Sequence, residues 1–194
     1  MKKKKALLLL GGGLDSTSLL LTQKEKYSIT GLFFRYGQKT ESSELRSCRY
    51  FCSKYRIKLI TKDLRGLSDL KKEKDYIVEG RNSIFIIKAI EIAREIKATE
   101  IMLGFHLEPR GTKYLDATKK YSLIMSDLIK CLTKGSIKLN TPFIDISRKE
   151  VLKRGYKIDQ EIINRTQTCY IKDGGCNICP HCKLKAEMVK KLSI

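Results

Sequence analysis

The stretch Leu7–Ser18, LLLLGGGLDSTS, joins an apolar run directly to three glycines and a polar tail. The apolar run Lys5–Leu10 predicts a strand buried on both faces, and Asp15–Lys24 predicts the helix that follows it. Bare backbone amides at the positive end of a helix can hold a phosphate, and the hydroxyls of Ser16 and Thr17 add donors. Neither the P-loop lysine nor GxGxxG spacing is present. On its own, the stretch therefore leaves a phosphate site and a tight turn equally open.

Runs with strand patterning alternate with runs of helical spacing along the rest of the chain. Further strands are expected at Ser28–Arg35, Ile57–Thr61, Glu100–Phe105 and Ile137–Phe143. Helices are expected at Glu41–Tyr55, from a cap at Asn82 or Ser83 to Ala93, at Tyr121–Leu132, and after a capping box of Ser147 and Glu150. Lys62–Glu79 is expected to be a charged, loop-like connection. The alternation predicts a doubly wound, Rossmann-like α/β domain with a five-stranded parallel sheet over residues 1–165. Ligands of such sheets bind at the carboxyl ends of the strands, near the topological switch point.

The formal net charge is +19, from 40 basic and 21 acidic residues. Such a charge attracts nucleotides, phosphates or nucleic acid. The lysines are scattered, however, and no RGG, RNP or basic-helix motif is present, so we expect no nucleic-acid partner. No window of about 18 apolar residues is present, and the apolar run after Met1–Lys5 is too short for a signal peptide. We therefore expect neither a membrane span nor secretion.

Four of the seven cysteines lie close together near the C-terminus, in the stretch Thr166–Lys183, TQTCYIKDGGCNICPHCK. An odd cysteine total without a secretion signal indicates a reducing compartment, so we expect a cytoplasmic protein. The spacing C-x6-C-x2-C-x2-C suits tetrahedral zinc, and four protein ligands leave no open position, so the zinc would be structural. An iron–sulfur cluster is the rival, because C-x2-C-x2-C also occurs in ferredoxin-type sites. We expect residues 166–194 to form a small zinc segment packed on the same domain, with the ligands Cys169, Cys176, Cys179 and Cys182.

The glycine loop resembles the pyrophosphate loop, usually written SGGxDS, of the N-type ATP pyrophosphatases (the PP-loop superfamily). Four further stretches, together with the loop, resemble one family within it, the 7-cyano-7-deazaguanine synthases of queuosine biosynthesis. These stretches are Tyr36-Gly37-Gln38, Val78–Asn82, Thr141–Phe143 and Thr166–Tyr170, the last of which precedes the cysteine knuckle. The loop alone is shared by many families, whereas the combination is specific, and the match covers essentially the whole chain.

The resemblance implies an ATP-dependent carbon–nitrogen ligase. Such an enzyme adenylates the carboxylate of 7-carboxy-7-deazaguanine, lets ammonia form an amide, and then activates and dehydrates the amide to the nitrile, with Mg²⁺ neutralising phosphate charge. A dimer is common in the family, which makes a homodimer the assembly that the resemblance suggests. Asp15 and Ser16 would be catalytic, and Asp15 would cap the helix or contact the metal–phosphate unit. The resemblance assigns ATP to Leu10, Gly11, Gly12, Gly13, Leu14, Asp15, Ser16 and Thr17, and the substrate to Tyr36, Gln38, Arg81, Asn82 and Asp116.

The chain also departs from the family pattern. Gly11 stands where a serine is usual, Thr40 stands where a histidine is usual, and Glu79 replaces a proline. The family's substrate stretch GYPDCR corresponds here to KYLDAT, Lys113–Thr118, which keeps Asp116 and loses the cysteine and the arginine. An arginine is a natural partner of a carboxylate, so these changes bear on the substrate more than on the ATP chemistry.

Two other hypotheses stay open at this point. A diverged paralogue would adenylate another carboxylate, or transfer a deazapurine to a macromolecule in defence or tRNA modification. Alternatively, the chain is a non-catalytic zinc protein that binds nucleic acid. The net charge and the cysteine knuckle are the observations behind this hypothesis. Among the remaining residues, His106 is expected to be structural, and Cys48 and Cys52 are expected to pack in the core.

Overall fold

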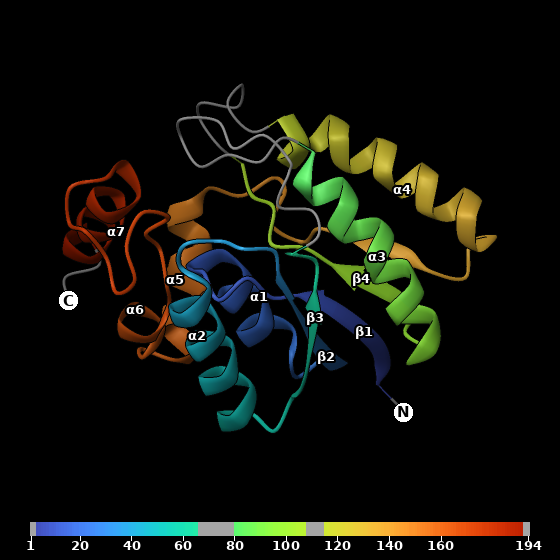
Figure 1. Ribbon diagram of the computed structural model, residues 1–194, viewed down its shortest axis with the longest axis horizontal. Coiled ribbons are helices and arrows are strands. Elements are labelled where there is room, and N and C mark those ends of the chain that lie inside the picture. The colour runs from blue at the N-terminus through green and yellow to red at the C-terminus, as the bar shows by residue number, and fades with distance from the viewer. Residues whose placement is uncertain (1–2, 66–79, 108–114, 192–194) are drawn as a thin grey trace.

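The computed structural model describes residues 3–65, 80–107 and 115–191 (Figure 1). It contains a five-stranded sheet in the order β3-β2-β1-β4-β5, and every neighbouring pair of strands is parallel. The expected five-stranded parallel α/β sheet is confirmed. The strands are β1 (Lys4–Leu9), β2 (Tyr27–Arg35), β3 (Lys58–Asp63), β4 (Glu100–Met102) and β5 (Lys138–Asn140).

Helices cover both faces of the sheet, while α7 lies at one end of the molecule (Figure 1). One apolar core contains residues of α1, α2 and α5, and a second core contains residues of α3 and α4. The helices are α1 (Leu14–Gln23), α2 (Glu41–Lys54), α3 (Arg81–Glu95), the short η2 (Leu115–Ala117), α4 (Lys119–Thr133), α5 (Arg148–Ile158), α6 (Ile162–Arg165) and α7 (Pro180–Lys191).

The apolar run of β1 supplies both cores. Leu8 and Leu10 belong to the core with α1 and α5, whereas Leu7 belongs to the core with α3 and α4. All three side chains are at least 98% buried, with exposed fractions of 0 to 2%. Alternate residues of a strand point to opposite faces, so a central strand between two helical layers needs apolar residues at every position. Cys48 and Cys52 lie in the first core, as expected.

The topological switch point lies between β1 and β4. From β1 the chain builds β2 and β3 on one side, and it then continues to β4 on the other side of β1. The loops after β1 and β4 therefore meet, and a Cβ added to Gly104 would lie 3.1 Å from backbone atoms of Asp15 and Ser16. Crevices of this kind are where open α/β sheets bind ligands.

Some expected boundaries are wrong. β4 ends at Met102 rather than at Phe105, because the chain then turns so that Gly104 packs against the glycine loop. β5 ends at Asn140 and is followed by turn residues. β3 continues to Asp63, two residues into the expected loop, and the rest of that loop from 66 to 79 lies outside the described residues. Among the described residues, no helix has the length and apolar character needed to cross a bilayer.

The helix caps were predicted in part. Ser147 caps α5 as expected, since its Oγ accepts a hydrogen bond from the Glu150 amide at 3.3 Å. α3 instead begins after Gly80, whose φ of +68° is left-handed, so neither Asn82 nor Ser83 is its cap. α1 is capped by the backbone of Gly13 rather than by Asp15, whose carboxylate turns toward other partners.

Candidate active site

A cavity of about 430 Å³ opens at the carboxyl ends of the central strands. Its volume falls within the range of small-molecule sites, about 300–1,000 Å³. The loops after β1, β2 and β4, the start of α3 and the cysteine segment all contribute to its wall. Residues predicted from the sequence that line it are Leu10, Gly11, Gly13, Leu14, Asp15, Ser16, Tyr36, Gln38, Arg81, Asn82 and Asp116.

Two residues predicted to bind ATP, Gly12 and Thr17, do not line the cavity. Gly12 has a φ of +67°, and a Cβ there would lie 2.2 Å from the Glu44 carbonyl oxygen. The Gly12 carbonyl also accepts a hydrogen bond of 3.0 Å from the Gln167 amide. Thr17 is fully buried at 0% exposure and is not among the cavity-lining residues. Both residues therefore shape the loop from its protein side.

Ser16 ties the glycine loop to itself. Its Oγ accepts a hydrogen bond from the Gly11 amide at 3.2 Å and donates one to the Gly13 carbonyl at 3.3 Å. Nothing lies within 4 Å of the place where a Cβ of Gly11 would stand. The loop thus presents an unobstructed backbone to the cavity, at the N-terminus of α1, where the helix dipole favours anions.

Asp15 faces two basic side chains across the cavity floor. Its Oδ2 lies 3.2 Å from Arg148 Nη2 and 3.6 Å from His106 Nε2, and Arg148 Nε donates to its Oδ1 at 3.3 Å. Burial alone would raise the pKa of Asp15, but Arg148 and His106 together lower it. Burial opposes charge on His106 as well, yet its hydrogen bond to Asp15 raises the His106 pKa. Asp15 is thereby held as a carboxylate.

The sequence analysis assigned no role in the site to Arg148 and expected His106 to be structural. The structure places both in the cavity wall. Arg148 is the first residue of α5, directly after the capping residue Ser147, and α5 packs against α1. The capping box located that helix start correctly. The contact between two helices 133 residues apart carried no signal in the sequence.

Gln38 braces the loop after β2. Its Oε1 accepts a hydrogen bond from the Tyr36 amide at 2.9 Å, and its Nε2 donates to the Phe34 carbonyl at 3.0 Å and to Glu44 Oε2 at 3.1 Å. The Glu44 carboxyl is buried, which raises its pKa, and it also accepts from Thr40 Oγ1 at 2.7 Å. Both amide hydrogens of Gln38 are engaged, so this side chain holds Tyr36 in place.

Arg81 also lines the cavity, where it lies among aromatic rings. Its Nη1 donates to Tyr36 Oη at 2.7 Å, and its guanidinium carbon lies 5.4 Å from the Tyr36 ring centroid and 5.8 Å from that of Phe85. Within the described residues, the buried Nε of Arg81 has no hydrogen-bond partner. Burial raises the pKa of Tyr36 to about 12, so its phenol stays neutral. This part of the cavity combines aromatic surface with a donor available to an anion.

Asn82 and Asp116 bind each other. The Asn82 backbone amide donates to Asp116 Oδ2 at 3.2 Å, and Asn82 Nδ2 donates to the Asp116 carbonyl at 2.9 Å. Asp116 lies in η2 and so satisfies a free amide in the first turn of α3. Both residues of the pair line the cavity.

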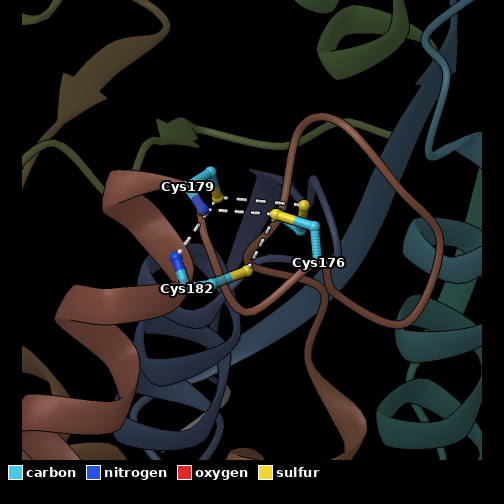
Figure 2. Close-up of side chains that lie close together, drawn as sticks. Cys176, Cys179 and Cys182 are labelled. Atoms are coloured by element: carbon cyan, nitrogen blue, oxygen red, sulfur yellow. Dashed lines mark hydrogen bonds between the residues drawn. The ribbon is translucent and has the colours of Figure 1, made fainter.

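The four C-terminal cysteines converge, and their sulfur atoms all lie within 4.8 Å of one another. Figure 2 shows three of them, Cys176, Cys179 and Cys182, side by side. Two sulfur–sulfur distances, Cys176–Cys182 and Cys179–Cys169, are 3.9 Å. Four thiolates around one tetrahedral ion at about 2.3 Å would lie roughly 3.8 Å apart, so the donor set fits a single metal ion. Backbone amides donate to the sulfurs, and those of Cys179 and Ile178 lower the pKa of Cys176 to about 6, which favours the metal-binding thiolate.

The cysteine segment also forms part of the cavity wall, which the sequence analysis did not predict. Gln167, Thr168, Tyr170 and His181 all line the cavity. The rings of Tyr170 and His181 meet edge to face, with centroids 4.6 Å apart and an interplanar angle of 78°. Helix α7, which begins within the segment, was also not predicted.

Solved structures with a similar fold include two proteins of low sequence identity. One is the U34-tRNA thiolase NcsA from Methanococcus maripaludis with its 4Fe-4S cluster, at TM-score 0.54 and 16% identity, matching 99% of this chain and 65% of that one. The other is a predicted subunit of tRNA methyltransferase from Methanocaldococcus jannaschii, at TM-score 0.52 and 16% identity, matching 79% of this chain and 76% of that one. At this identity the likeness concerns the fold.

Sequence comparison is more specific. A 7-cyano-7-deazaguanine synthase from Methanosphaera stadtmanae is 26% identical over 99% of this chain and 96% of its own length. The synthase of Nautilia profundicola is 28% identical over 98% of this chain and 96% of its own length. The family described as "Queuosine biosynthesis protein QueC" matches residues 5–75 and 69–193. The chain therefore belongs to the QueC family.

Proposed function

We propose that the protein is an ATP-dependent ligase that converts 7-carboxy-7-deazaguanine and ammonia to 7-cyano-7-deazaguanine through adenylated intermediates. The observation that carries the proposal is a single cavity that joins the glycine loop after β1 to the aromatic and cationic end around Arg81. A ligase of this type needs both ends at once, because ATP and the carboxylate must react with each other in one enclosed space.

ATP is assigned to the end formed by the glycine loop. The backbone around Gly11 and Gly13 is open to the cavity, and the N-terminus of α1 adds a positive dipole beneath it. These groups stabilise the charge that develops on pyrophosphate as it leaves. Ser16 holds the loop in that shape, and its hydroxyl becomes a donor to phosphate if it releases Gly13. Asp15, kept ionised by Arg148, is then placed to contact the magnesium that accompanies ATP.

The deazapurine carboxylate is assigned to the end formed by Arg81. The ring would lie against Tyr36 and Phe85, which contact each other at 5.3 Å between centroids, and the buried guanidinium would hold the carboxylate. Gln38 serves this end by fixing Tyr36 rather than by reading the base itself. KYLDAT lacks the family's arginine, and Arg81 is the guanidinium assigned to the carboxylate in this part of the cavity, where its neighbour Asn82 bonds to Asp116.

The reaction balances in two rounds. In the first, a carboxylate oxygen displaces pyrophosphate from ATP, and ammonia then displaces AMP to give the amide. In the second, the amide oxygen displaces pyrophosphate from another ATP, and loss of AMP and of both N–H protons leaves the nitrile. The protein contributes positioning and charge stabilisation to both rounds.

Zinc is assigned to the four cysteines as a structural ion. The sulfur separations suit one tetrahedral ion better than a cluster, in which each thiolate binds a different iron. Bound zinc would cross-link the segment after Gln167 to α7. We place the protein in the cytoplasm, where thiols stay reduced.

The test is direct. Zinc-loaded protein is incubated with 7-carboxy-7-deazaguanine, ammonia and MgATP, and AMP, pyrophosphate and the nitrile are followed by chromatography with mass detection. The Ser16→Ala variant should lose about 100-fold in rate, while Ser42→Ala, an exposed serine in the first turn of α2, should keep the wild-type rate. Folded, zinc-loaded protein that yields neither AMP nor nitrile refutes the proposal.

A second candidate keeps the adenylation and changes the acceptor. Ala117 and Thr118 line the cavity where the family pattern has cysteine and arginine, so the wall at this point is smaller and uncharged. A diverged enzyme acting on another carboxylate, or passing an activated deazapurine to a macromolecule, would use that space. Steady AMP release with a different carboxylate, and none with 7-carboxy-7-deazaguanine, would select this candidate.

A further inference from the structure

Gln167 connects the cysteine segment to the glycine loop. Its side chain is buried, with 8% of the residue exposed. Its Nε2 donates to the carbonyls of Cys169 at 2.8 Å and Lys172 at 2.9 Å, and its Oε1 accepts from the Gly174 amide at 3.2 Å. Three hydrogen bonds from one amide thus hold the loop that joins the first metal-binding cysteine to the second.

The backbone of the same residue holds the glycine loop. The Gln167 amide donates to the Gly12 carbonyl at 3.0 Å, and the Gln167 carbonyl lies 3.4 Å from the place where a Cβ of Gly13 would stand. On its other side, Gly12 is fixed against the backbone of Glu44. The loop after β1 is therefore held between α2 and the cysteine segment, and Gln167 is its contact on the segment side.

We propose that Gln167 is a positioning residue that couples metal binding at the four cysteines to nucleotide binding at the glycine loop. The inference rests on the proposed ATP site. A metal ion fixes Cys169 relative to the other three ligands, and the hydrogen bonds of the Gln167 amide pass that fixed geometry to its backbone. The backbone then holds Gly12, so the loop is preorganised for phosphate before ATP arrives.

Loss of the metal would leave the glycine loop less well ordered. Four thiols brought within 4.8 Å of one another then have no bond that keeps them together. The loop between Cys169 and Cys176 then has more conformations, and Gln167 loses defined partners. Ordering these residues becomes part of the cost of binding ATP. Metal-free protein should consequently bind ATP more weakly, and by linkage ATP should tighten metal binding by the same factor.

The reciprocity is measured on the wild-type full-length chain. The dissociation constant of the ATP analogue AMPPNP with magnesium is determined by calorimetry in zinc-loaded and zinc-free protein, without the carboxylate substrate, so that no adenylate forms. Zinc affinity is determined by competition with a chromogenic chelator, with and without AMPPNP. We expect both affinities to change by the same factor of about tenfold, within the 5- to 150-fold span typical of coupled sites.

The variant Gln167→Met tests the residue itself. Methionine keeps the approximate volume and the backbone bond to Gly12, and it removes all three side-chain hydrogen bonds. The coupling factor should fall to within about twofold of unity, whereas the same change at Gln160, an exposed glutamine between α5 and α6, should leave it unchanged. If Gln167→Met does not fold, Gln167→Glu, which cannot donate to the two carbonyls, replaces it.

The outcomes separate the claims. AMPPNP binding that is equal with and without zinc in the wild type refutes the coupling and leaves the proposed function intact. A Gln167 variant that is less stable yet keeps the wild-type coupling factor shows a structural role only, and overturns the assignment to this residue. No AMPPNP binding to zinc-loaded wild type refutes the ATP site, and the coupling with it.

Discussion

Replacing Arg148 by methionine removes the stronger partner of Asp15 and keeps most of the side-chain volume. The pair is largely buried, with side-chain exposures of 13% for Arg148 and 23% for Asp15, and it has two contacts of 3.2 and 3.3 Å. Breaking a buried ion pair from one side costs about 3–5 kcal/mol, because the remaining charge is left unpaired. His106 still lies 3.6 Å from Asp15, which places the expected loss at about 3 kcal/mol. For a chain of this size the melting temperature should fall by roughly 6–12 °C.

Arg154→Met is the matched control, because it makes the same change on the same helix. Arg154 pairs with Glu150 at 3.0 Å, with side-chain exposures of 48% and 42%. An exposed i,i+4 pair contributes about 0.3–0.5 kcal/mol, so its melting temperature should stay within about 2 °C of wild type. Circular dichroism of zinc-loaded protein at pH 7, followed during heating and in urea, gives the melting temperature and the free energy of unfolding of each variant.

The pH dependence gives a second check on Arg148. The carboxylate of Asp15 has a lowered pKa, so it stabilises the fold above the ordinary carboxyl pKa of about 3.9 and loses that effect as the pH falls through the lowered value. The stability gap between wild type and Arg148→Met should therefore narrow in acid below about pH 4. Equal losses in Arg148→Met and Arg154→Met at pH 7 would refute the assignment of a buried pair at the cavity floor.

Three further predictions concern the same region. Because Asp15 raises the pKa of His106, the stabilisation from this pair is fully present below about pH 6.5 and is lost as the pH rises through the raised pKa. The free energy of unfolding in urea should therefore fall more in His106→Gln at pH 6 than at pH 9. Equal losses at the two pH values would contradict this. In Gly12→Ala the added Cβ would clash with the Glu44 carbonyl at a backbone φ of +67°, so the free energy of unfolding in urea should fall by about 3–5 kcal/mol. In Gly11→Ala the added Cβ has nothing within 4 Å, so the free energy of unfolding should stay within about 1 kcal/mol of wild type. Zinc removal should lower the melting temperature, and restored zinc should recover it in a concentration-dependent way; identical melting curves would argue against a structural ion.

Local patterns explain why much of the fold was predictable. From Ala6 to Leu9, β1 has no polar position, which is the pattern of a strand covered on both faces. The Ser147–Glu150 box marked the start of α5 correctly because a capping interaction spans only three residues. β4 was predicted too long because Leu103 and Phe105, which follow it, are buried in the core with α3 and α4 without belonging to the strand.

The candidate site was predictable where its residues are neighbours in sequence. The glycine loop and the cysteine spacing are local, and most of the loop residues line one cavity. Contact between Gln38 and the substrate stays a prediction, and the structure adds that the Gln38 amide bonds to Phe34, Tyr36 and Glu44. A side chain's free donors depend on what packs around it, and sequence spacing does not report that.

The sequence by itself determined the fold class, the loop that follows the first strand and the four thiols that can hold one metal. Each of these depends on residues within a turn, a strand or a knuckle, so short-range physical chemistry is sufficient. Only the tertiary structure decided that Arg148 pairs with Asp15 and that Gln167 contacts Gly12, contacts that span 133 residues in the first case. Such contacts are set by how whole helices and segments pack on the sheet, because packing brings together groups whose chemistry is independent of their separation along the chain.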